Sequence, residues 1–232
     1  MTRTSLVLIP GLLCTADLFD AQISDLRDLA EVTIGDHTQS ETMAGIARDI
    51  LATAPREFAL AGLSMGGYVA FEILRQAPQR VTRLALLDTS ARPDLPEQTA
   101  NRERLVELAN KRGIEPAAEQ LLAKLVAPSR RGDDAIVGKI IEMAKATGAE
   151  AFARQQKAIA ARVDSRPLLA HISCPTLVLV GSDDELTPPS VAAEMASAIP
   201  GCRLEVVQGA GHLSPMEEPA AVTAALRFWL ER

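Results

Sequence analysis

Residues 62–66 read Gly-Leu-Ser-Met-Gly, a match to the pattern G-x-S-x-G. An apolar run over residues 58–61 precedes this motif, and a helical pattern over residues 68–75 follows it. A serine at such a strand-to-helix junction lies on a very sharp turn, so the residues two positions away on either side must lack a side chain. The turn holds the serine oxygen clear of the sheet, where the positive end of the following helix stabilises negative charge. We therefore predict that Ser64 is a nucleophile.

Outward from this motif, short apolar runs alternate with helical patterns. A short apolar run that ends at turn residues is typical of a buried strand. Strands that alternate with helices form parallel βαβ units, so we predict an α/β fold with a doubly wound, mostly parallel sheet. The runs that predict strands cover residues 5–9, 31–35, 58–61, 81–87, 174–180 and 203–207.

The alternation stops near residue 90 and resumes near residue 172. Between these points the sequence shows helical periodicity without a convincing strand, and turn residues divide it into four predicted helices. We therefore predict that residues 1–90 and 171–232 form one α/β core. Residues 91–170 are predicted to be an all-helical insertion in that core.

Composition and charge limit the function classes. The chain has 232 residues, with 24 Lys and Arg against 30 Asp and Glu, which gives a net charge of −6. This balance argues against nucleic acid or an anionic membrane surface as a partner. No apolar run approaches the roughly 18 residues of a membrane-spanning helix, and the first residues lack a signal-peptide core, so we expect a cytoplasmic protein. Cys14, Cys174 and Cys202 are scattered without the spacing of a metal site.

A serine hydroxyl needs a base to act as a nucleophile, and the chain has three histidines. His212 lies in a loop after the last predicted strand, where Gly209 and Gly211 allow the loop to approach another part of the backbone. His37 follows the second predicted strand and His171 ends the helical insertion, and we assign neither a function. His212 is the predicted base.

A carboxylate orients such an imidazole, sets its tautomer and stabilises its charged form. Three acidic residues, Asp183, Asp184 and Glu185, follow the predicted strand over residues 174–180. We prefer Asp184 as this carboxylate and keep Asp183 as the alternative. Asp88 ends another predicted strand, and we expect it to cap the turn that follows through side-chain-to-backbone hydrogen bonds.

Three motifs of the chain, taken in their order, resemble the α/β-hydrolase fold family in its small serine esterase-like branch. The motifs are Gly62-Leu-Ser-Met-Gly-Gly67, Gly181-Ser-Asp-Asp-Glu-Leu-Thr-Pro188 and Gly211-His212. The resemblance covers essentially the whole chain. In that family the acid stands three residues after the glycine and the base comes last, which favours Asp184 over Asp183. The family also carries a cap between its sixth and seventh strands, and residues 91–170 match this cap in position and length.

The resemblance also implies an oxyanion hole and the size of the sheet. In the family, the loop after the corresponding strand usually reads His-Gly, followed by a residue whose N–H binds the oxyanion. This chain has Pro10 in place of that histidine, followed by Gly11 and Leu12. The implied donors are the backbone N–H groups of Leu12 and Met65. Because the chain begins near the family's third strand, we expect about six strands.

Together these residues predict a serine hydrolase that cleaves a carboxylic ester through an acyl-enzyme, without a metal or an organic cofactor. Aromatic residues make up 3% of the chain, so we expect an aliphatic pocket and a small, mainly aliphatic ester as the partner molecule. C–C bond hydrolases and acyltransferases use the same three residues and remain alternatives. Arginines within the insertion could bind the carboxylate of a C–C hydrolase substrate; these are Arg102, Arg104, Arg154 and Arg162. The alternative from another class is a non-catalytic ligand receptor on a hydrolase scaffold. The oligomeric state stays open.

Overall fold

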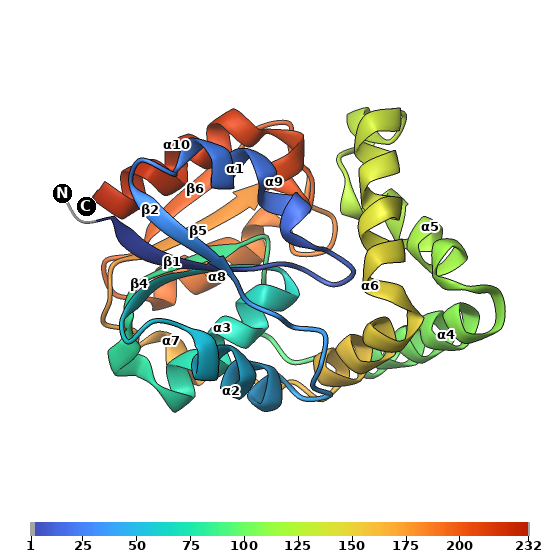
Figure 1. The fold of residues 1–232 in the computed structure, drawn as a ribbon, viewed down its shortest axis with the longest axis horizontal. Coiled ribbons are helices and arrows are strands. Elements are labelled where there is room, and N and C mark those ends of the chain that lie inside the picture. The colour runs from blue at the N-terminus through green and yellow to red at the C-terminus, as the bar shows by residue number, and fades with distance from the viewer. Residues whose placement is uncertain (1–2, 232) are drawn as a thin grey trace.

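A six-stranded sheet forms the centre of the computed structural model, which describes residues 3–231. The strand order is β2-β1-β3-β4-β5-β6 and all neighbouring pairs are parallel, which confirms the predicted doubly wound sheet (Figure 1). β3 and β5 are buried along their whole length, as expected for parallel strands covered on both faces. The strands are β1 (Thr4–Ile9), β2 (Ala30–Ile34), β3 (Phe58–Leu63), β4 (Val81–Leu87), β5 (Thr176–Gly181) and β6 (Arg203–Val207).

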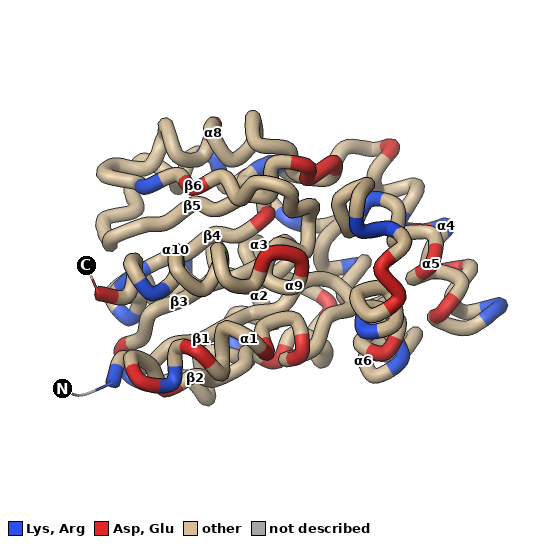
Figure 2. The backbone as a smooth tube through the Cα atoms, turned by 90° about the horizontal axis from the view of Figure 1, so that it is seen from above, with Lys and Arg blue, Asp and Glu red and all other residues tan. Residues whose placement is uncertain are grey.

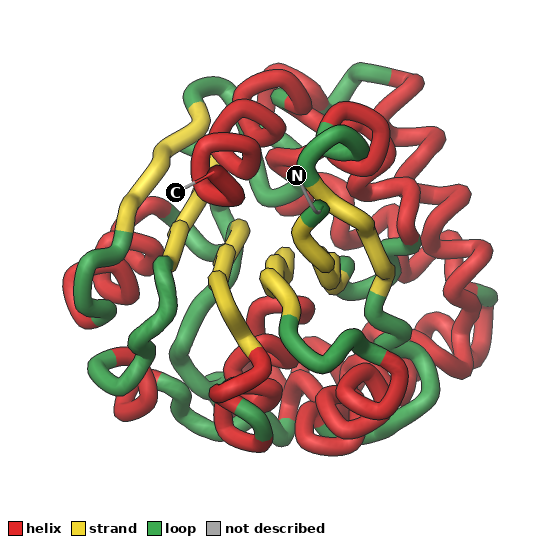
Figure 3. The backbone as a smooth tube through the Cα atoms, turned by 60° about the vertical axis from the view of Figure 1, so that its left-hand side comes forward, coloured by secondary structure: helices red, strands yellow, loops and turns green. Residues whose placement is uncertain are grey.

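Helices cover both faces of the sheet (Figure 3). Successive side chains of a strand point to opposite faces, so Val7 and Ile9 of β1 pack in one half of the core, and Leu6 and Leu8 in the other. The first half is completed by α2 (Met43–Thr53), α3 (Met65–Gln76) and α8 (Pro189–Ala198), and the second by α1 (Asp20–Asp25) and α10 (Pro219–Glu231). Shorter elements are the helices α7 (Arg166–Leu169) and α9 (Ser214–Glu217), and 3-10 turns at Ala16–Phe19, Pro78–Arg80 and Pro128–Arg130.

The first helical region is shorter than its sequence pattern suggests. The apolar residues of positions 17–30 are spaced as in one amphipathic helix, but α1 ends at Asp25. The backbone N–H of Thr4 donates to the carbonyl oxygen of Leu29 at 2.8 Å, and Ala30 pairs with Thr4 in the sheet. Pairing with β1 therefore forces this segment to leave the helical conformation before residue 30.

The segment between β4 and β5 contains α4 (Pro96–Arg112), α5 (Ile114–Leu125) and α6 (Asp134–Ala160). Gly148 has a φ of +78°, which breaks the helical geometry of α6, so its two halves match the last two of the four predicted helices. Figure 1 shows these helices together at one end of the sheet. Phe152 and Leu105 belong to a cluster that also includes Leu13, from the loop after β1. The helices therefore pack against the carboxyl edge of the sheet.

Charged residues are mixed along this helical segment (Figure 2). The side chain of Asp94 is buried and pairs with Arg102 at 2.9 Å and with the also buried side chain of Arg162 at 2.6 Å. These two ion pairs tie α4 and the end of α6 to the segment that leaves β4. Among the helices of residues 3–231, none combines the length and the apolar character needed to cross a membrane.

We predict that Gly66→Ala destabilises the fold. A Cβ atom at Gly66 would lie 2.1 Å from the carbonyl oxygen of Ile9, and backbone in the centre of a sheet cannot move away. We expect a loss of about 3 kcal/mol in the free energy of unfolding, measured by urea denaturation. Gly138→Ala in α6 is the matched control, because a Cβ there meets nothing within 4 Å, and it should gain up to about 1 kcal/mol. Equal stability of Gly66→Ala and wild type would contradict the close approach.

Candidate active site

Ser64 lies on the turn between β3 and α3 with a φ of 53° and a ψ of −112°. Such a conformation costs a non-glycine residue energy, so it needs support from its surroundings. The Ser64 N–H donates to the carbonyl oxygen of Leu87 at 2.9 Å, and the hydroxyl of Thr89 donates to the carbonyl oxygen of Ser64 at 2.7 Å. A Cβ at Gly62 would lie 2.3 Å from the carbonyl oxygen of Gly66. The two motif glycines are therefore required by space.

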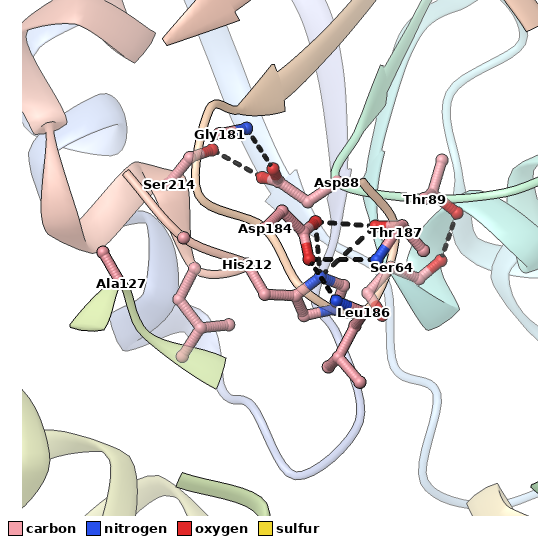
Figure 4. Close-up of polar contacts among 12 residues, drawn as sticks. Ser64, Asp88, Thr89, Ala127, Gly181, Asp184, Leu186, Thr187, His212 and Ser214 are labelled. Carbon is pink, nitrogen blue, oxygen red and sulfur yellow. Dashed lines mark hydrogen bonds and ion pairs between the residues drawn. The ribbon is translucent and has the colours of Figure 1, made fainter. Parts of the chain in front are cut away.

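The loop after β6 brings His212 to Ser64 (Figure 4). The Nε2 atom of His212 lies 2.8 Å from Ser64 Oγ, and its Nδ1 atom lies 2.8 Å from Oδ2 of Asp184. A carboxylate only accepts hydrogen bonds, so the proton of a neutral His212 is on Nδ1 and Nε2 accepts from the serine hydroxyl. This arrangement allows the imidazole to take the proton of Ser64 while Asp184 stabilises the resulting charge.

Of the two carboxylates that the sequence left open, the structure brings Asp184 to His212. Asp184 is buried, whereas Asp183 is exposed and its carboxylate accepts from the neighbouring Ser182 hydroxyl at 3.2 Å. Asp184 also accepts from the N–H of Leu186 at 2.8 Å and from the N–H and hydroxyl of Thr187 at 3.0 and 2.7 Å. These donors fix the position of the Asp184 carboxylate next to the imidazole.

The two buried groups shift each other's pKa values. Burial by itself would lower the pKa of His212, but the charge and hydrogen bond of Asp184 act in the opposite direction, and the net result is a raised pKa. Burial would raise the pKa of Asp184, but the charge and hydrogen bond of His212, together with the Thr187 donors, lower it overall. Asp184 therefore stays ionised over the range in which His212 titrates.

The implied oxyanion donors lie on two segments that meet at Ser64. Met65 is the first residue of α3, so its N–H has no acceptor one turn earlier. Leu12 follows Gly11, where a Cβ atom would lie 3.6 Å from Cβ of Ser64. Within residues 3–231, neither the Leu12 nor the Met65 N–H donates to a protein acceptor. Both groups are therefore free to bind an oxygen atom next to Ser64.

The family described as the Alpha/beta hydrolase family matches residues 6–226. The chain belongs to the α/β-hydrolase family. The matched residues span the sheet, apart from the first two residues of β1, and include Ser64, Asp184 and His212.

Solved structures and curated proteins include enzymes similar to this α/β-hydrolase. A thermophilic esterase from Thermogutta terrifontis, solved with malate bound, is 35% identical with a TM-score of 0.91, over 99% of this chain and 90% of that one. The 3-oxoadipate enol-lactonase 2 of Acinetobacter baylyi is 26% identical over 244 residues, which cover 99% of this chain and 90% of that protein. The non-heme bromoperoxidase-like protein BpoC of Mycobacterium tuberculosis is 33% identical over 174 residues, which cover 72% of this chain but 66% of that protein. Like these relatives, the hydrolase is an enzyme.

Asp88 does not cap the turn after β4, contrary to our expectation. Its buried carboxyl group accepts from the N–H of Gly181 at 2.8 Å and hydrogen-bonds the hydroxyl of Ser214 at 2.5 Å. Burial first, and then the charge of Asp184, raise the pKa of Asp88 to about 8. Asp88 has a φ of +43°, and its side chain finds its partners at the end of β5 and the start of α9 rather than in the turn that follows it. Asp88 thus joins the loop of the acid to the segment that follows His212.

Sequence analysis missed Glu217, a buried carboxylate on α9. Its Oε2 atom accepts from the N–H groups of Gly211 and Ala127 at 3.0 and 2.7 Å, and its Oε1 atom accepts from Leu213 at 3.2 Å. Two of these donors flank His212, and Ala127 belongs to the helical segment. One side chain therefore holds the histidine loop and attaches it to the helices above. A glutamate in a short helix gives no sequence signal for this contact.

The other histidines and the cysteines make no hydrogen bond to Ser64, Asp184 or His212 within residues 3–231. His171 is exposed, and His37 is buried next to the loop after β1. Burial raises the pKa of Cys14 to about 12 and that of Cys202 to about 11, so both thiols stay protonated and are poor nucleophiles. Over the described part of the chain, no three His, Cys, Asp or Glu side chains are grouped to hold a metal ion.

We predict that Glu217→Ala destabilises the hydrolase by about 3 kcal/mol, because the buried N–H groups of Gly211 and Ala127 lose their acceptor, whereas Leu213 keeps its bond to the carbonyl oxygen of Leu125. The matched control is Glu218→Ala, which removes a half-exposed pair with Arg130 and should cost less than about 1 kcal/mol. Thermal and urea unfolding of the three proteins measure the difference. If both variants lose the same stability, the hydrogen bonds of Glu217 to the histidine loop do not stabilise the fold.

Proposed function

We propose that this α/β-hydrolase is a serine esterase that cleaves carboxylic esters of small, mainly aliphatic acids through an acyl-enzyme. The observation that carries the proposal is the position of the His212 ring: its Nε2 atom lies 2.8 Å from Ser64 Oγ, and its Nδ1 atom lies 2.8 Å from Asp184 Oδ2. The similarity to an esterase and to an enol-lactonase supports the choice of ester chemistry, because a lactone is a cyclic ester.

In the first half-reaction, Ser64 Oγ attacks the ester carbonyl carbon and its proton moves to Nε2 of His212. Negative charge develops on the carbonyl oxygen, where the N–H groups of Leu12 and Met65 donate hydrogen bonds. Each such donor contributes roughly 3–4 kcal/mol to the stabilisation of the transition state. The intermediate then breaks its bond to the alcohol oxygen, which takes the proton from His212, and the acyl group stays on Ser64.

In the second half-reaction, a water molecule gives a proton to His212 and attacks the acyl carbon. The same two N–H groups bind the oxyanion again. When the intermediate breaks its bond to Ser64, the proton returns from His212 to Oγ and the free acid leaves. Asp184 stays ionised throughout and compensates the charge of the imidazolium in each half-reaction.

Apolar residues around the nucleophile support an aliphatic acyl group. Leu12 is half-buried and packs against both the core and the cluster of the helical segment. Met65, the residue after Ser64, and Leu213, the residue after His212, are buried. We propose that α4, α5 and α6 form a cap over this site. In support, the N–H of Leu213 donates to the carbonyl oxygen of Leu125 at 3.1 Å, directly after His212.

The ion pairs of the helical segment argue against a C–C bond hydrolase. Such an enzyme needs a free cation for the carboxylate of its substrate, and the insertion offered four arginines. Arg102 and Arg162 are engaged with the buried Asp94, and Arg154 donates from Nε to the carbonyl oxygen of Thr38 at 2.8 Å. These contacts give three of the arginines a structural role.

Hydrolysis of p-nitrophenyl acetate, butyrate and octanoate tests the proposal. We expect turnover of the shorter esters by the wild type, and loss of both turnover and fluorophosphonate labelling in Ser64→Ala. Asp184→Asn should lower kcat by about 10²–10⁴-fold, because it leaves His212 without a charged partner. Asp183→Asn is the matched control, since Asp183 is exposed, and should stay within threefold of wild type. A wild type that turns over none of these esters, or a Ser64→Ala protein that still reacts with the probe, would disprove the esterase.

The raised pKa of His212 predicts the pH dependence. Only the neutral imidazole accepts the proton of Ser64, so kcat/KM should rise as His212 loses its own proton. Because Asp184 raises the pKa of His212 overall, the midpoint of this rise should lie above about 6.5, the value of an unperturbed histidine. A pH series of kcat/KM from 5 to 9 measures it. A midpoint well below that value, or a flat profile, would contradict the role of His212.

A further inference from the structure

The loop after β1 carries the Leu12 donor in an unusual backbone conformation. Leu13 has a φ of +60°, which costs a leucine energy and needs support. Two side chains from distant parts of the chain contact this loop. Nε2 of His37 lies 2.9 Å from the carbonyl oxygen of Gly11, and the N–H of Leu13 donates to Oε1 of Gln155 at 3.2 Å.

These contacts fall on the two peptide groups that flank Leu12. A peptide group is planar and trans, so the carbonyl of Gly11 and the N–H of Leu12 point in opposite directions from one rigid plane. A hydrogen bond that holds the Gly11 carbonyl therefore also sets the direction of the Leu12 N–H. The next peptide group carries the N–H of Leu13, and Gln155 holds it. Rotation of either plane would break a hydrogen bond.

Both side chains are buried, which gives these hydrogen bonds their strength. His37 is 3% exposed and Gln155 is fully buried. A carbonyl oxygen only accepts, so His37 carries its proton on Nε2, and burial lowers the pKa of His37, which keeps the ring neutral. The donor on Gly11 also polarises the peptide and makes the Leu12 N–H a better donor.

The amide group of Gln155 is only partly satisfied by hydrogen bonds. Within residues 3–231, its Nε2 atom is buried and has no hydrogen-bond partner, which lowers the stability of the fold. A leucine or methionine would avoid this penalty but could not accept from Leu13. Gln155 belongs to the second half of α6, after the break at Gly148. The contact therefore links the helical segment directly to the loop after β1 that carries Leu12, which we call the oxyanion loop.

We propose that His37 and Gln155 are positioning residues for the oxyanion donor Leu12, an inference that rests on the proposed esterase function. His37 orients the peptide that carries the Leu12 N–H, and Gln155 prevents the following peptide from turning. Because Gln155 comes from α6, the oxyanion hole is complete only when this helix is seated on the core. Neither residue contacts Ser64, His212 or Asp184 through a hydrogen bond.

Kinetics of His37→Leu and Gln155→Leu test this inference. Removal of a whole oxyanion donor lowers kcat by about 10²–10³-fold, so misplacement of one donor should lower kcat by about 10–100-fold with KM within threefold. The affinity for a trifluoromethyl ketone, whose adduct with Ser64 places an oxyanion in the hole, should fall by the same factor as kcat/KM. His37→Gln, which retains an N–H donor, should recover part of the loss, and Gln155→Glu, which retains the acceptor, should recover part of it in the second variant.

Gln156→Leu is the matched control. Gln156 is the next residue of α6 and is also buried with an unpartnered Nε2 within the described residues. Within the same residues, its Oε1 atom accepts from Arg102, and it makes no hydrogen bond to the loop. The kcat of Gln156→Leu should therefore stay within threefold of wild type. The inference is overturned if His37→Leu and Gln155→Leu keep full kcat, if their loss lies in KM alone, if the ketone binds as tightly as to wild type, or if Gln156→Leu loses as much. The two conservative variants decide the question if the leucine variants do not fold. An inactive wild type, by contrast, overturns the esterase itself and this inference with it.

Discussion

The carbonyl oxygen of Ile9, at the end of β1, approaches Gly66, in the first turn of α3, so closely that a Cβ atom at Gly66 would lie 2.1 Å from this oxygen. No side-chain atom fits between them, and the turn at Ser64 has to adopt a φ of +53° to allow it. The contact places the hydroxyl of Ser64, the N–H of Met65 and the loop that contains Leu12 next to one another. The other residues of the proposed active site lie around this contact between β1 and α3.

Buried polar side chains hold the remaining loops at this edge of the sheet. Asp88 links the end of β5, before the loop of Asp184, to the start of α9, after the loop of His212. Glu217 binds the residues on both sides of His212 and also the helical segment. His37 and Gln155 do the same for the loop after β1. In a low-dielectric interior such contacts are strong when satisfied and costly when broken. Hydrogen bonds therefore hold each loop in one conformation. Apolar packing alone, which has no direction, would allow several.

The sequence predicted the sheet well because parallel buried strands are continuous apolar runs and turn residues separate them. It predicted Ser64 because the glycines of its motif are demanded by local space. Asp184 and Asp183 could not be separated by their residue type, since both follow the same strand, and only the turn through Thr187 shows which one faces His212. Asp88 was misjudged because its partners, Gly181 and Ser214, are remote in sequence.

The amino-acid sequence by itself determined the α/β class, the parallel sheet, the helical character of the segment between β4 and β5, and the residue types that carry hydrolytic chemistry. Those properties depend on local patterns, over stretches no longer than one strand and one helix. The tertiary structure alone decided which buried side chains meet across the loops: Glu217 at the histidine loop, and His37 and Gln155 at the oxyanion loop. Such contacts join residues up to 142 positions apart, and their formation depends on how the whole chain closes around the sheet.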